Sequence, residues 1–200
     1  MKSGTTVVLA AGDFPRKGGD AWDLLSSACR VVACDSAARA FRRRFGRWPD
    51  VIVGDLDSLG RCPKGVDVVR VSEQETNDLE KALALCERRG WKRPIVVGAT
   101  GKREDHMIGN VFRCLERGVE IVTDRGRFVP LCGRTTLEVV QGAAISVFAT
   151  DRATRMTSHG LEWPLDGVAF DNLYCATLNR AVAARVVIVT TKPAYAYIAS

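Results

Sequence analysis

The chain has 200 residues, of which 46% are hydrophobic and 26% charged, ordinary values for a soluble protein with a sizeable core. The net charge of +6 favours anionic partners, among which nucleotide phosphates, nucleic acids and anionic lipids all qualify. No stretch is apolar for long enough to span a bilayer, and the apolar run near the N-terminus is too short for a signal peptide. We therefore expect a cytoplasmic protein with no membrane partner.

The cysteines give no sign of a disulfide framework. Their number is odd, and no C-x-x-C pair occurs. We expect most of them to be small core residues in a reducing compartment. They are Cys29, Cys34, Cys62, Cys86, Cys114, Cys132 and Cys175.

Up to about residue 125, short apolar runs alternate with helical patterns. The runs predicted as strands are Thr5–Ala10, Val31–Cys34, Val51–Val53, Val66–Val71, Ile95–Val97 and Val119–Thr123. Helices are predicted at Ala21–Cys29, after an N-cap at Asp35, after an N-cap at Asn77 with Glu80 in a capping box, and from about Asp105. This alternation predicts a doubly wound, mostly parallel α/β sheet.

After Asp124 the helical pattern disappears, and short apolar segments are separated by glycine and proline. The predicted strands are Leu137–Val140, Ala144–Ala149, Tyr174–Thr177, Ala184–Thr190 and Tyr195–Ala199. We therefore expect two domains: an α/β domain at residues 1–125 and a small antiparallel all-β, sandwich-like domain at residues 130–200.

Acidic residues gather where the predicted parallel strands end, which is the edge of an open α/β sheet where ligands bind. They are Asp35, Asp55, Asp57, Asp78 and Asp105. Carboxylates so close together repel one another, and Mg²⁺ relieves that repulsion because it prefers oxygen ligands. If Gly54–Ser58 is extended, Asp55 and Asp57 point the same way and Leu56 points into the core. The alternative is an ordinary polar turn.

The segment from Gly98 to His106 adds positive charge to this edge. Gly98 and Gly101 free the backbone, while Lys102 and Arg103 are suited to binding phosphate oxygens. His106 and Asn110 follow on one face of the next helix. The segment is not a Walker A loop, and the alternative is a flexible loop with solvated charges.

Six segments, in order and over nearly the whole chain, resemble the motifs of the thiamine pyrophosphokinase family. They are Ala33–Ala38, Gly54–Ser58, Gln74–Ala82, Gly101–His106, Gly160–Leu165 and Thr177–Asn179. Gly54–Ser58, for example, resembles the family's Gly-Asp-x-Asp-Ser, and Gly101–His106 its Gly-Gly-Arg-x-Asp-His. The departures are Ser36, Ala37 and Lys102 in place of glycines, Asn77 in place of threonine, and Thr177 and Leu178 in a serine-rich segment.

The resemblance implies an ATP:thiamine diphosphotransferase that passes a pyrophosphoryl group from ATP to the hydroxyl of thiamine, giving thiamine diphosphate and AMP. In this reaction the hydroxyl attacks the β-phosphorus. The resemblance also implies Mg²⁺ as cofactor and a homodimer, with the β domain contributing thiamine binding and dimerisation. Nucleic acid is not an expected partner.

The resemblance also assigns roles to residues of this chain. It implies that Mg²⁺ is bound by Asp55, Asp57 and Asp78, with Asp35 and Asp105 nearby. The implied ATP-binding residues are Asp35, Gln74, Asn77, Gly98, Gly101, Arg103 and Asn110. The implied thiamine-binding residues are Trp163, Thr177 and Asn179. The implied catalytic residues are Asp57, Asp78, Arg103 and Asp105, with either Asp57 or Asp105 taking the hydroxyl proton. For Trp163 the alternative is a buried core tryptophan, and His159 is expected to be structural or exposed.

Two other functions use the same residues. A Mg²⁺-dependent phosphatase or nucleotidyltransferase would need the same aspartates. A nucleic-acid-binding module would use the basic run Arg39, Arg42, Arg43, Arg44 and Arg47, although such runs are commonly solvated helix faces.

Overall fold

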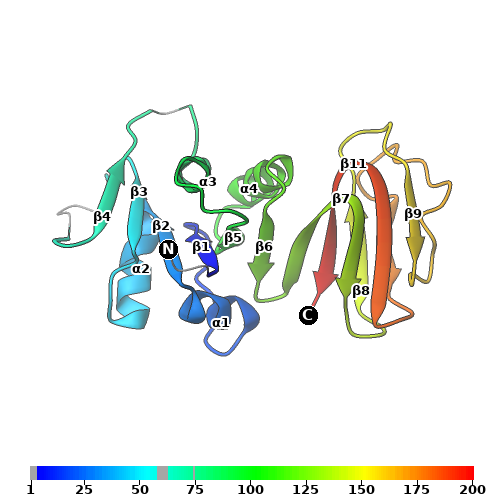
Figure 1. Ribbon diagram of the computed structural model, residues 1–200, viewed down its shortest axis with the longest axis horizontal. Coiled ribbons are helices and arrows are strands. Elements are labelled where there is room, and N and C mark those ends of the chain that lie inside the picture. Colours follow the sequence, from blue (N-terminus) through cyan, green and yellow to red (C-terminus); the bar gives the residue numbers. More distant parts are fainter. Residues whose placement is uncertain (1–3, 58–62, 74) are drawn as a thin grey trace. The chain divides into compact units, whose positions relative to one another are not determined.

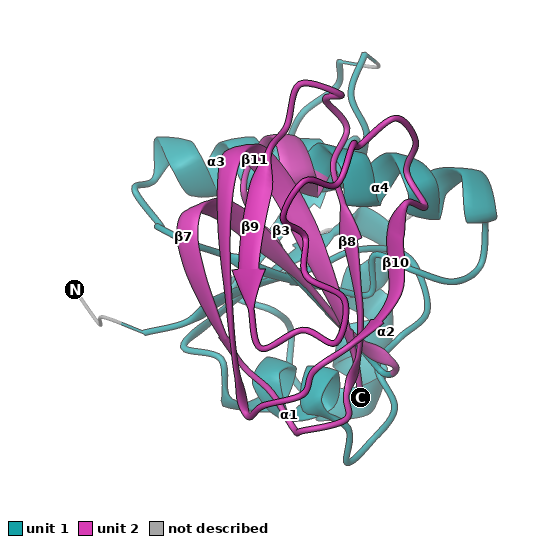
Figure 2. Ribbon diagram, turned by 90° about the vertical axis from the view of Figure 1, so that its right-hand side faces the viewer, with its two compact units in different colours: residues 1–113, 121–124 teal, residues 114–120, 125–200 magenta. Residues whose placement is uncertain are grey.

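The computed structural model describes residues 4–57, 63–73 and 75–200, which form two compact units (Figure 2). The first unit comprises residues 1–113 and 121–124, and the second comprises residues 114–120 and 125–200. The buried Tyr195 joins residues 114–120 to the second unit, because its phenol donates a hydrogen bond to the carbonyl of Val119. Each unit has its own hydrophobic core.

The sheet of the first unit follows the predicted strand pattern. Its strands are β1 (Thr6–Leu9), β2 (Arg30–Cys34), β3 (Val51–Gly54), β4 (Asp67–Arg70), β5 (Ile95–Val97) and β6 (Glu120–Thr123). β1 pairs in parallel with β2 and β5, and β3 pairs in parallel with β2 and β4. The order is β6-β5-β1-β2-β3-β4, so the chain first moves away from β1 on one side and then returns to its other side. This is the doubly wound arrangement expected from the sequence.

In the described part of the first unit, four helices cover the two faces of this sheet. They are α1 (Asp20–Ser27), α2 (Asp35–Phe45), α3 (Asp78–Arg88) and α4 (Glu104–Glu116). Figure 1 shows α1 and α2 on one side of the sheet and α3 and α4 on the other. Asn77 caps α3 as predicted, since its side chain accepts a hydrogen bond of 2.9 Å from the amide of Glu80. The N-cap prediction for Asp35 is wrong: Cys34 is the N-cap and Asp35 is the first helical residue.

The second unit is antiparallel, as predicted, but its strands differ in length and in the segments that form them. They are β7 (Gly126–Glu138), β8 (Ala144–Phe148), β9 (Met156–His159), β10 (Ala176–Arg180) and β11 (Arg185–Ala199). β7 is far longer than the strand predicted near its end, β9 was not predicted, and β11 joins two predicted strands into one. β11 pairs with β7 along its length, with β9 through its first half and with β8 through its second.

A bulge divides β11 between these partners. The register with β7 shifts between Thr190 and Ala194, and Pro193 lies in the shifted stretch. Proline has no N–H for the ladder, so a bulge is where a long strand tolerates it. The side chains that face inward from both halves meet in one core with those of β7 and β8, among them Leu131, Ile145 and Ile188.

The prediction that the cysteines are core residues holds for only half of those described. Cys34, Cys86 and Cys114 are buried, whereas Cys29, Cys132 and Cys175 are exposed, and none of these six forms a disulfide bond. Cys62 lies outside the described residues.

None of the helices in the described chain is long and apolar enough to cross a membrane.

Candidate active site

A pocket of about 390 Å³ with several charged lining residues opens in the first unit where the strand order reverses, between β1 and β5. Open α/β sheets bind their ligands at this switch point, beyond the carboxyl ends of the strands. The walls come from the end of β2, from the segments after β1, β3 and β5, and from the beginnings of α3 and α4. Among the lining residues are Ala11, Gly12, Cys34, Asp55, Asn77, Asp78, Lys81, Gly101, Lys102, Arg103, His106 and Asn110.

Gly54, the last residue of β3, lies against two carboxylate side chains. A β-carbon built on it would lie 2.8 Å from Cβ of Asp35 and 3.3 Å from Oδ1 of Asp78. Its φ of 156° is also rarely adopted by residues with a side chain. Asp35 is buried at the start of α2, and Asp78 is the first residue of α3. Glycine at this position therefore lets two carboxylates approach one strand end.

Lys81 places a positive charge beside the carboxylates of Asp35, Asp55 and Asp78. The sequence interpretation did not select it as a site residue. Its side chain is only 3% exposed, and its ammonium lies 3.6 Å from Oδ1 of Asp78. Burial raises the pKa of Asp78, Lys81 opposes that rise, and the charges of Asp55 and Asp35 add to it. The available signal was the i, i+3 spacing of Asp78 and Lys81 at the start of a helix.

The segment after Gly54 is a turn and not an extended strand. Leu56 has a φ of 70°, and the amide of Asp57 donates to Oδ1 of Asp55 at 3.3 Å. Asp55 lines the pocket, whereas Asp57 is exposed and is not among the lining residues. The expectation that both carboxylates point the same way from an extended strand is therefore wrong. Leu56 packs against the core, as expected.

The glycine-rich loop after β5 packs closely against the loop after β1. The amide of Gly12 donates to the carbonyl of Gly98 at 2.7 Å, and the amide of Asp13 donates to the carbonyl of Thr100 at 2.8 Å. Gly101 has a φ of 79°, and a β-carbon built on it would lie 2.1 Å from Oδ2 of Asp13. Gly98 is also left-handed and lies beside the pocket, while Gly101 lines it. Any other residue at position 101 would need a left-handed backbone and a displaced Asp13 side chain.

Arg103 and Asp105 pair with each other at the start of α4. The Nε and Nη2 atoms of Arg103 donate to the two carboxylate oxygens of Asp105, at 3.1 and 2.6 Å. These bonds lower the pKa of Asp105 to about 2 and raise that of Arg103. Arg103 lines the pocket, but Asp105 does not. Where Arg103 lines the pocket, its Nε and Nη2 atoms therefore already bind a carboxylate.

Two asparagines link α3, α4 and the glycine-rich loop. The side-chain amide of Asn77 donates to Oδ1 of Asn110 at 3.1 Å, and that of Asn110 donates to the carbonyl of Ala99 at 3.1 Å. Both asparagines line the pocket, and so does His106. These two hydrogen bonds connect three segments of the pocket wall. Gln74, predicted to contact ATP, and Ser58 of the Gly54–Ser58 motif lie outside the described residues.

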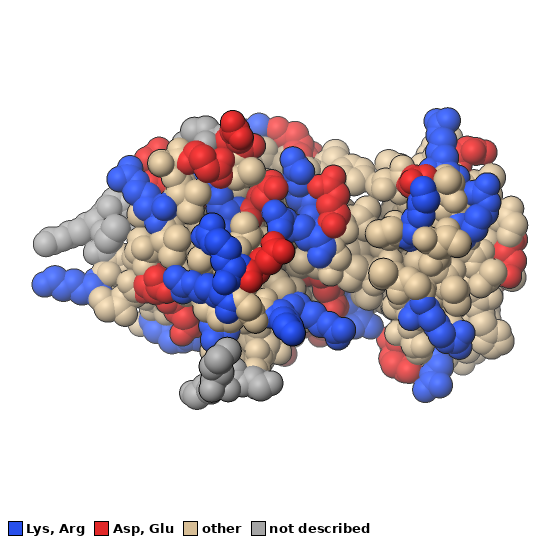
Figure 3. Space-filling model, turned by 45° about the horizontal axis from the view of Figure 1, so that its top comes forward, with Lys and Arg blue, Asp and Glu red and all other residues tan. Residues whose placement is uncertain are grey.

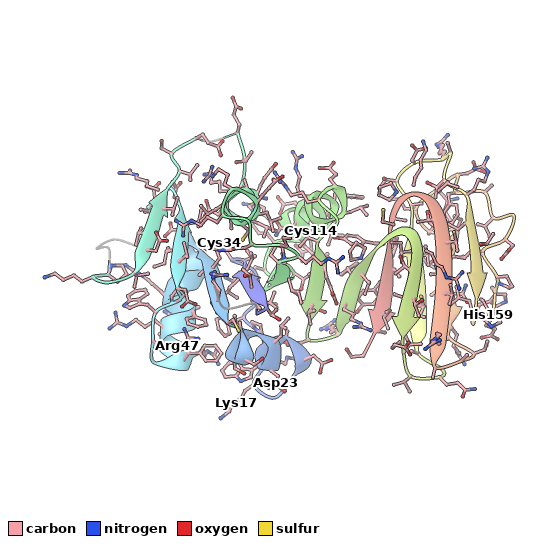
Figure 4. All side chains as sticks on the ribbon, viewed as in Figure 1. Lys17, Asp23, Cys34, Arg47, Cys114 and His159 are labelled. Carbon is pink, nitrogen blue, oxygen red and sulfur yellow. The ribbon has the colours of Figure 1, made fainter. Side chains whose placement is uncertain are left out.

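The candidate thiamine residues lie in the second unit. Asn179 is buried, with its Oδ1 accepting from the amide of Trp163 at 3.2 Å and its Nδ2 donating to the Trp163 carbonyl at 2.7 Å. Trp163 is 55% exposed, so the buried-core alternative is wrong. Thr177 donates to the carbonyl of Tyr174 at 2.9 Å. His159 is exposed on β9, as expected (Figure 4).

The basic run of α2 contacts aromatic side chains of its own unit. The guanidinium of Arg42 lies 4.6 Å from the ring centre of Trp48, and the guanidinium of Arg47 lies 5.0 Å from the ring centre of Phe41. Arg47 follows the end of α2, whereas Cys34, which lines the pocket, precedes its start (Figure 4). On the face that Figure 3 presents, acidic and basic side chains are intermingled. These contacts favour a structural role for the run.

Fold and pocket define a doubly wound α/β protein with an added antiparallel unit and a charged pocket at the switch point of its sheet. Two family models meet near residue 125, where the second unit's long segment begins: the thiamin pyrophosphokinase catalytic domain matches residues 21–123, and the thiamin pyrophosphokinase substrate-binding domain matches residues 126–197. The chain therefore belongs to the thiamin pyrophosphokinase family, a family of kinase-type enzymes that use ATP as co-substrate. The resemblance found in the sequence is confirmed, and the alternatives are not favoured.

Individual relatives agree with this assignment. A curated relative, thiamin pyrophosphokinase 1 of Caenorhabditis elegans, is 24% identical over 169 residues, which cover 74% of this chain and 70% of the relative. The thiamin pyrophosphokinase of Geobacillus thermodenitrificans has a TM-score of 0.77 at 21% identity, covering 98% of this chain and 97% of the other. A family protein of Enterococcus faecalis has a TM-score of 0.78 at 16% identity, covering 98% of both chains. These structural likenesses show the shared fold.

Proposed function

We propose that the protein transfers the pyrophosphoryl group of ATP to the hydroxyl of thiamine, releasing AMP and thiamine diphosphate. The observation that carries the proposal is the pocket at the switch point of the sheet, which combines two carboxylates with three cationic side chains. Its charged lining residues are Asp55, Asp78, Lys81, Lys102 and Arg103. Such a set suits the binding and transfer of phosphate groups, which require positioning and charge neutralisation above all.

The donor set also fits Mg²⁺. Asp55 and Asp78 both line the pocket, and the raised pKa of Asp78 reflects partly the charges of Asp55 and Asp35, so these carboxylates are close enough to repel one another. Among the residues described, no three His, Cys, Asp or Glu side chains are grouped as a metal site. Mg²⁺ is nonetheless commonly held by one or two carboxylates together with substrate phosphates. We assign it to Asp55 and Asp78, with Asp57 as a further ligand from the same turn.

When bound, the ion neutralises charge on the phosphate oxygens. The chain's own residues do the rest. Lys81 holds Asp78 in its ionised form, and Arg103 binds phosphate oxygens. Asn77 and Asn110 hold α3 and α4 in place beside the nucleotide, and Gly98 and Gly101 let its phosphates approach the backbone. Gln74 is assigned to ATP as well, on the motif alone.

Two carboxylates are candidates for taking the proton of the thiamine hydroxyl. With a pKa of about 2, Asp105 is a weak base at neutral pH while Arg103 binds it. We therefore assign Asp105 to holding Arg103 at the start of α4. Asp57 stays the candidate base, a role that its carboxylate can take only while it does not bind Mg²⁺.

The second unit would supply the thiamine site. Trp163 is exposed yet fixed through its backbone to the buried Asn179, so its ring is available for stacking on the aminopyrimidine or contact with the cationic thiazolium. Thr177 lies on the same strand as Asn179. Exposed Tyr174 and Leu178 add apolar surface nearby, which supports a homodimer formed through this unit. Light scattering at micromolar concentration tests the dimer, and a monomer would contradict it.

The test of the function is incubation with ATP, Mg²⁺ and thiamine, followed by identification of the products by mass. Thiamine diphosphate and AMP in equal amounts would support the proposal. Free phosphate without a modified acceptor would indicate a phosphatase. A nucleotidyl group on the acceptor, with pyrophosphate released, would indicate a nucleotidyltransferase. Asp78→Asn is the matched inactive control.

A further inference from the structure

Lys102 has a strained backbone. Its φ of 56° lies in the left-handed region, which disfavours any residue with a β-carbon. In the family motif that this segment resembles, a glycine stands at this position, and glycine adopts that conformation without strain. Strained residues are retained where the surrounding structure holds them, and they concentrate at functional sites. The position therefore calls for an explanation in terms of the side chain.

The Lys102 side chain connects the two loops at the switch point of the sheet. Its ammonium donates a hydrogen bond of 2.7 Å to the carbonyl of Ala11. Ala11 follows β1 and Lys102 follows β5, the neighbouring strands at which the order reverses. Both residues line the pocket. The ammonium is thus held at the wall of the pocket and is otherwise exposed.

The charge of Lys102 is more available to a ligand than those of the other two cations in the lining. Lys81 lies 3.6 Å from a carboxylate oxygen of Asp78, and Arg103 makes two hydrogen bonds with Asp105. The acceptor of Lys102 is an uncharged carbonyl. A hydrogen bond from an ammonium to a charged oxygen is about twice as strong as one between neutral groups. A phosphate oxygen would therefore compete well with the Ala11 carbonyl.

We propose that Lys102 binds the terminal phosphates of the nucleoside triphosphate, its ammonium moving from the Ala11 carbonyl to a phosphate oxygen when the nucleotide enters. This inference rests on the proposed function, because it requires ATP in this pocket. It adds to that function a phosphate-binding residue that the motif's glycine cannot supply. The side chain would thereby distinguish a triphosphate from a monophosphate.

Calorimetric titration with ATP and with AMP, without thiamine, tests the proposal on four proteins. Lys102→Gly removes both the charge and the strain, and Lys102→Met removes the charge alone. Arg93→Gly is the matched control, because Arg93 is another exposed basic residue with a left-handed φ, of 51°, and does not line the pocket. We expect both Lys102 variants to bind ATP about tenfold more weakly, the loss of roughly one charged contact. AMP binding by these variants, and ATP binding by Arg93→Gly, should change less than about twofold.

Kinetics give a second readout that a purely structural role would not move. In Lys102→Met the KM for ATP should rise while the KM for thiamine stays unchanged. ATP affinity equal to wild type in Lys102→Met would overturn the inference alone, since wild type would still bind ATP. An equal loss for ATP and AMP would also overturn it, because the contact would not be with the terminal phosphates. Failure of the wild type to bind ATP would overturn the proposed function together with this inference.

Discussion

Replacing Lys81 by methionine tests whether this lysine neutralises the acidic group of the pocket. The variant keeps much of the side-chain volume and removes the charge that lies 3.6 Å from Asp78. At that distance, with an effective dielectric constant of about 20, the attraction is about 4–5 kcal/mol. The desolvation of the buried ammonium and the partial exposure of Asp78, 32%, offset part of it. We expect a net loss of about 2 kcal/mol, which lowers Tm by about 4–8 °C in a protein of this size.

The pH dependence of this loss identifies its cause. Burial already raises the pKa of Asp78, and without Lys81 the pKa should rise further. A carboxyl whose folded pKa is raised contributes stability that is fully present below its unfolded pKa and is lost as pH rises through the folded pKa. The difference in Tm between wild type and Lys81→Met should therefore be largest near pH 7 and shrink toward pH 4.

Thermal unfolding in metal-free buffer measures both effects. Lys92→Met is the control, because Lys92 is an exposed lysine of the same unit that does not line the pocket; its Tm should match that of the wild type. The reasoning is refuted if Lys81→Met unfolds at the wild-type temperature at pH 7. It is equally refuted if the difference in Tm stays constant from pH 7 to pH 4.

Three further substitutions probe other parts of the molecule. In denaturant titration, Gly101→Ala should lower the free energy of unfolding by about 2 kcal/mol or more. The control Gly90→Ala should lower it by about 1 kcal/mol, because Gly90 has a similar φ but open space around it. Equal losses would contradict the close contact at Gly101. Arg103→Ala should return the pKa of Asp105 from about 2 toward its ordinary value in an NMR titration, and an unchanged pKa would exclude the pairing. Trp163→Ala should raise the KM for thiamine far more than that for ATP, and equal effects would remove Trp163 from the thiamine site.

The sequence predicts the first unit better than the second, for a physical reason. Strands buried on both faces appear as unbroken apolar runs, as in Val51–Gly54, and this pattern needs no knowledge of their neighbours. β9, in contrast, has one buried residue, Met156, among polar ones, and its strand conformation depends on pairing with β11. Gly133 and Pro193 resemble strand ends in sequence, but in the structure each lies inside a long strand.

The site was predictable in its position but not in its contacts. Because the carboxyl ends of parallel strands share one edge, the sequence could bring Asp35, Asp55 and Asp78 together. It could not show that the left-handed Leu56 turns Asp57 away from an extended path, since backbone conformation at a non-glycine residue leaves no pattern. Nor could it show that Lys81 is buried, because an i, i+3 pair looks the same on an exposed helix face.

The position of β11 affects the order in which the protein can fold. β7, β8 and β9 all pair with it, yet it is synthesised after them, so these strands leave the ribosome before their common partner exists. The parallel pairs β1–β2 and β2–β3 join segments that are near one another in sequence and need no later strand. In a nascent chain arrested before Arg185, we expect limited proteolysis to cut after residue 125 and spare β1 to β3. If proteolysis spared both β1 to β3 and the residues after 125, the second unit would fold without β11.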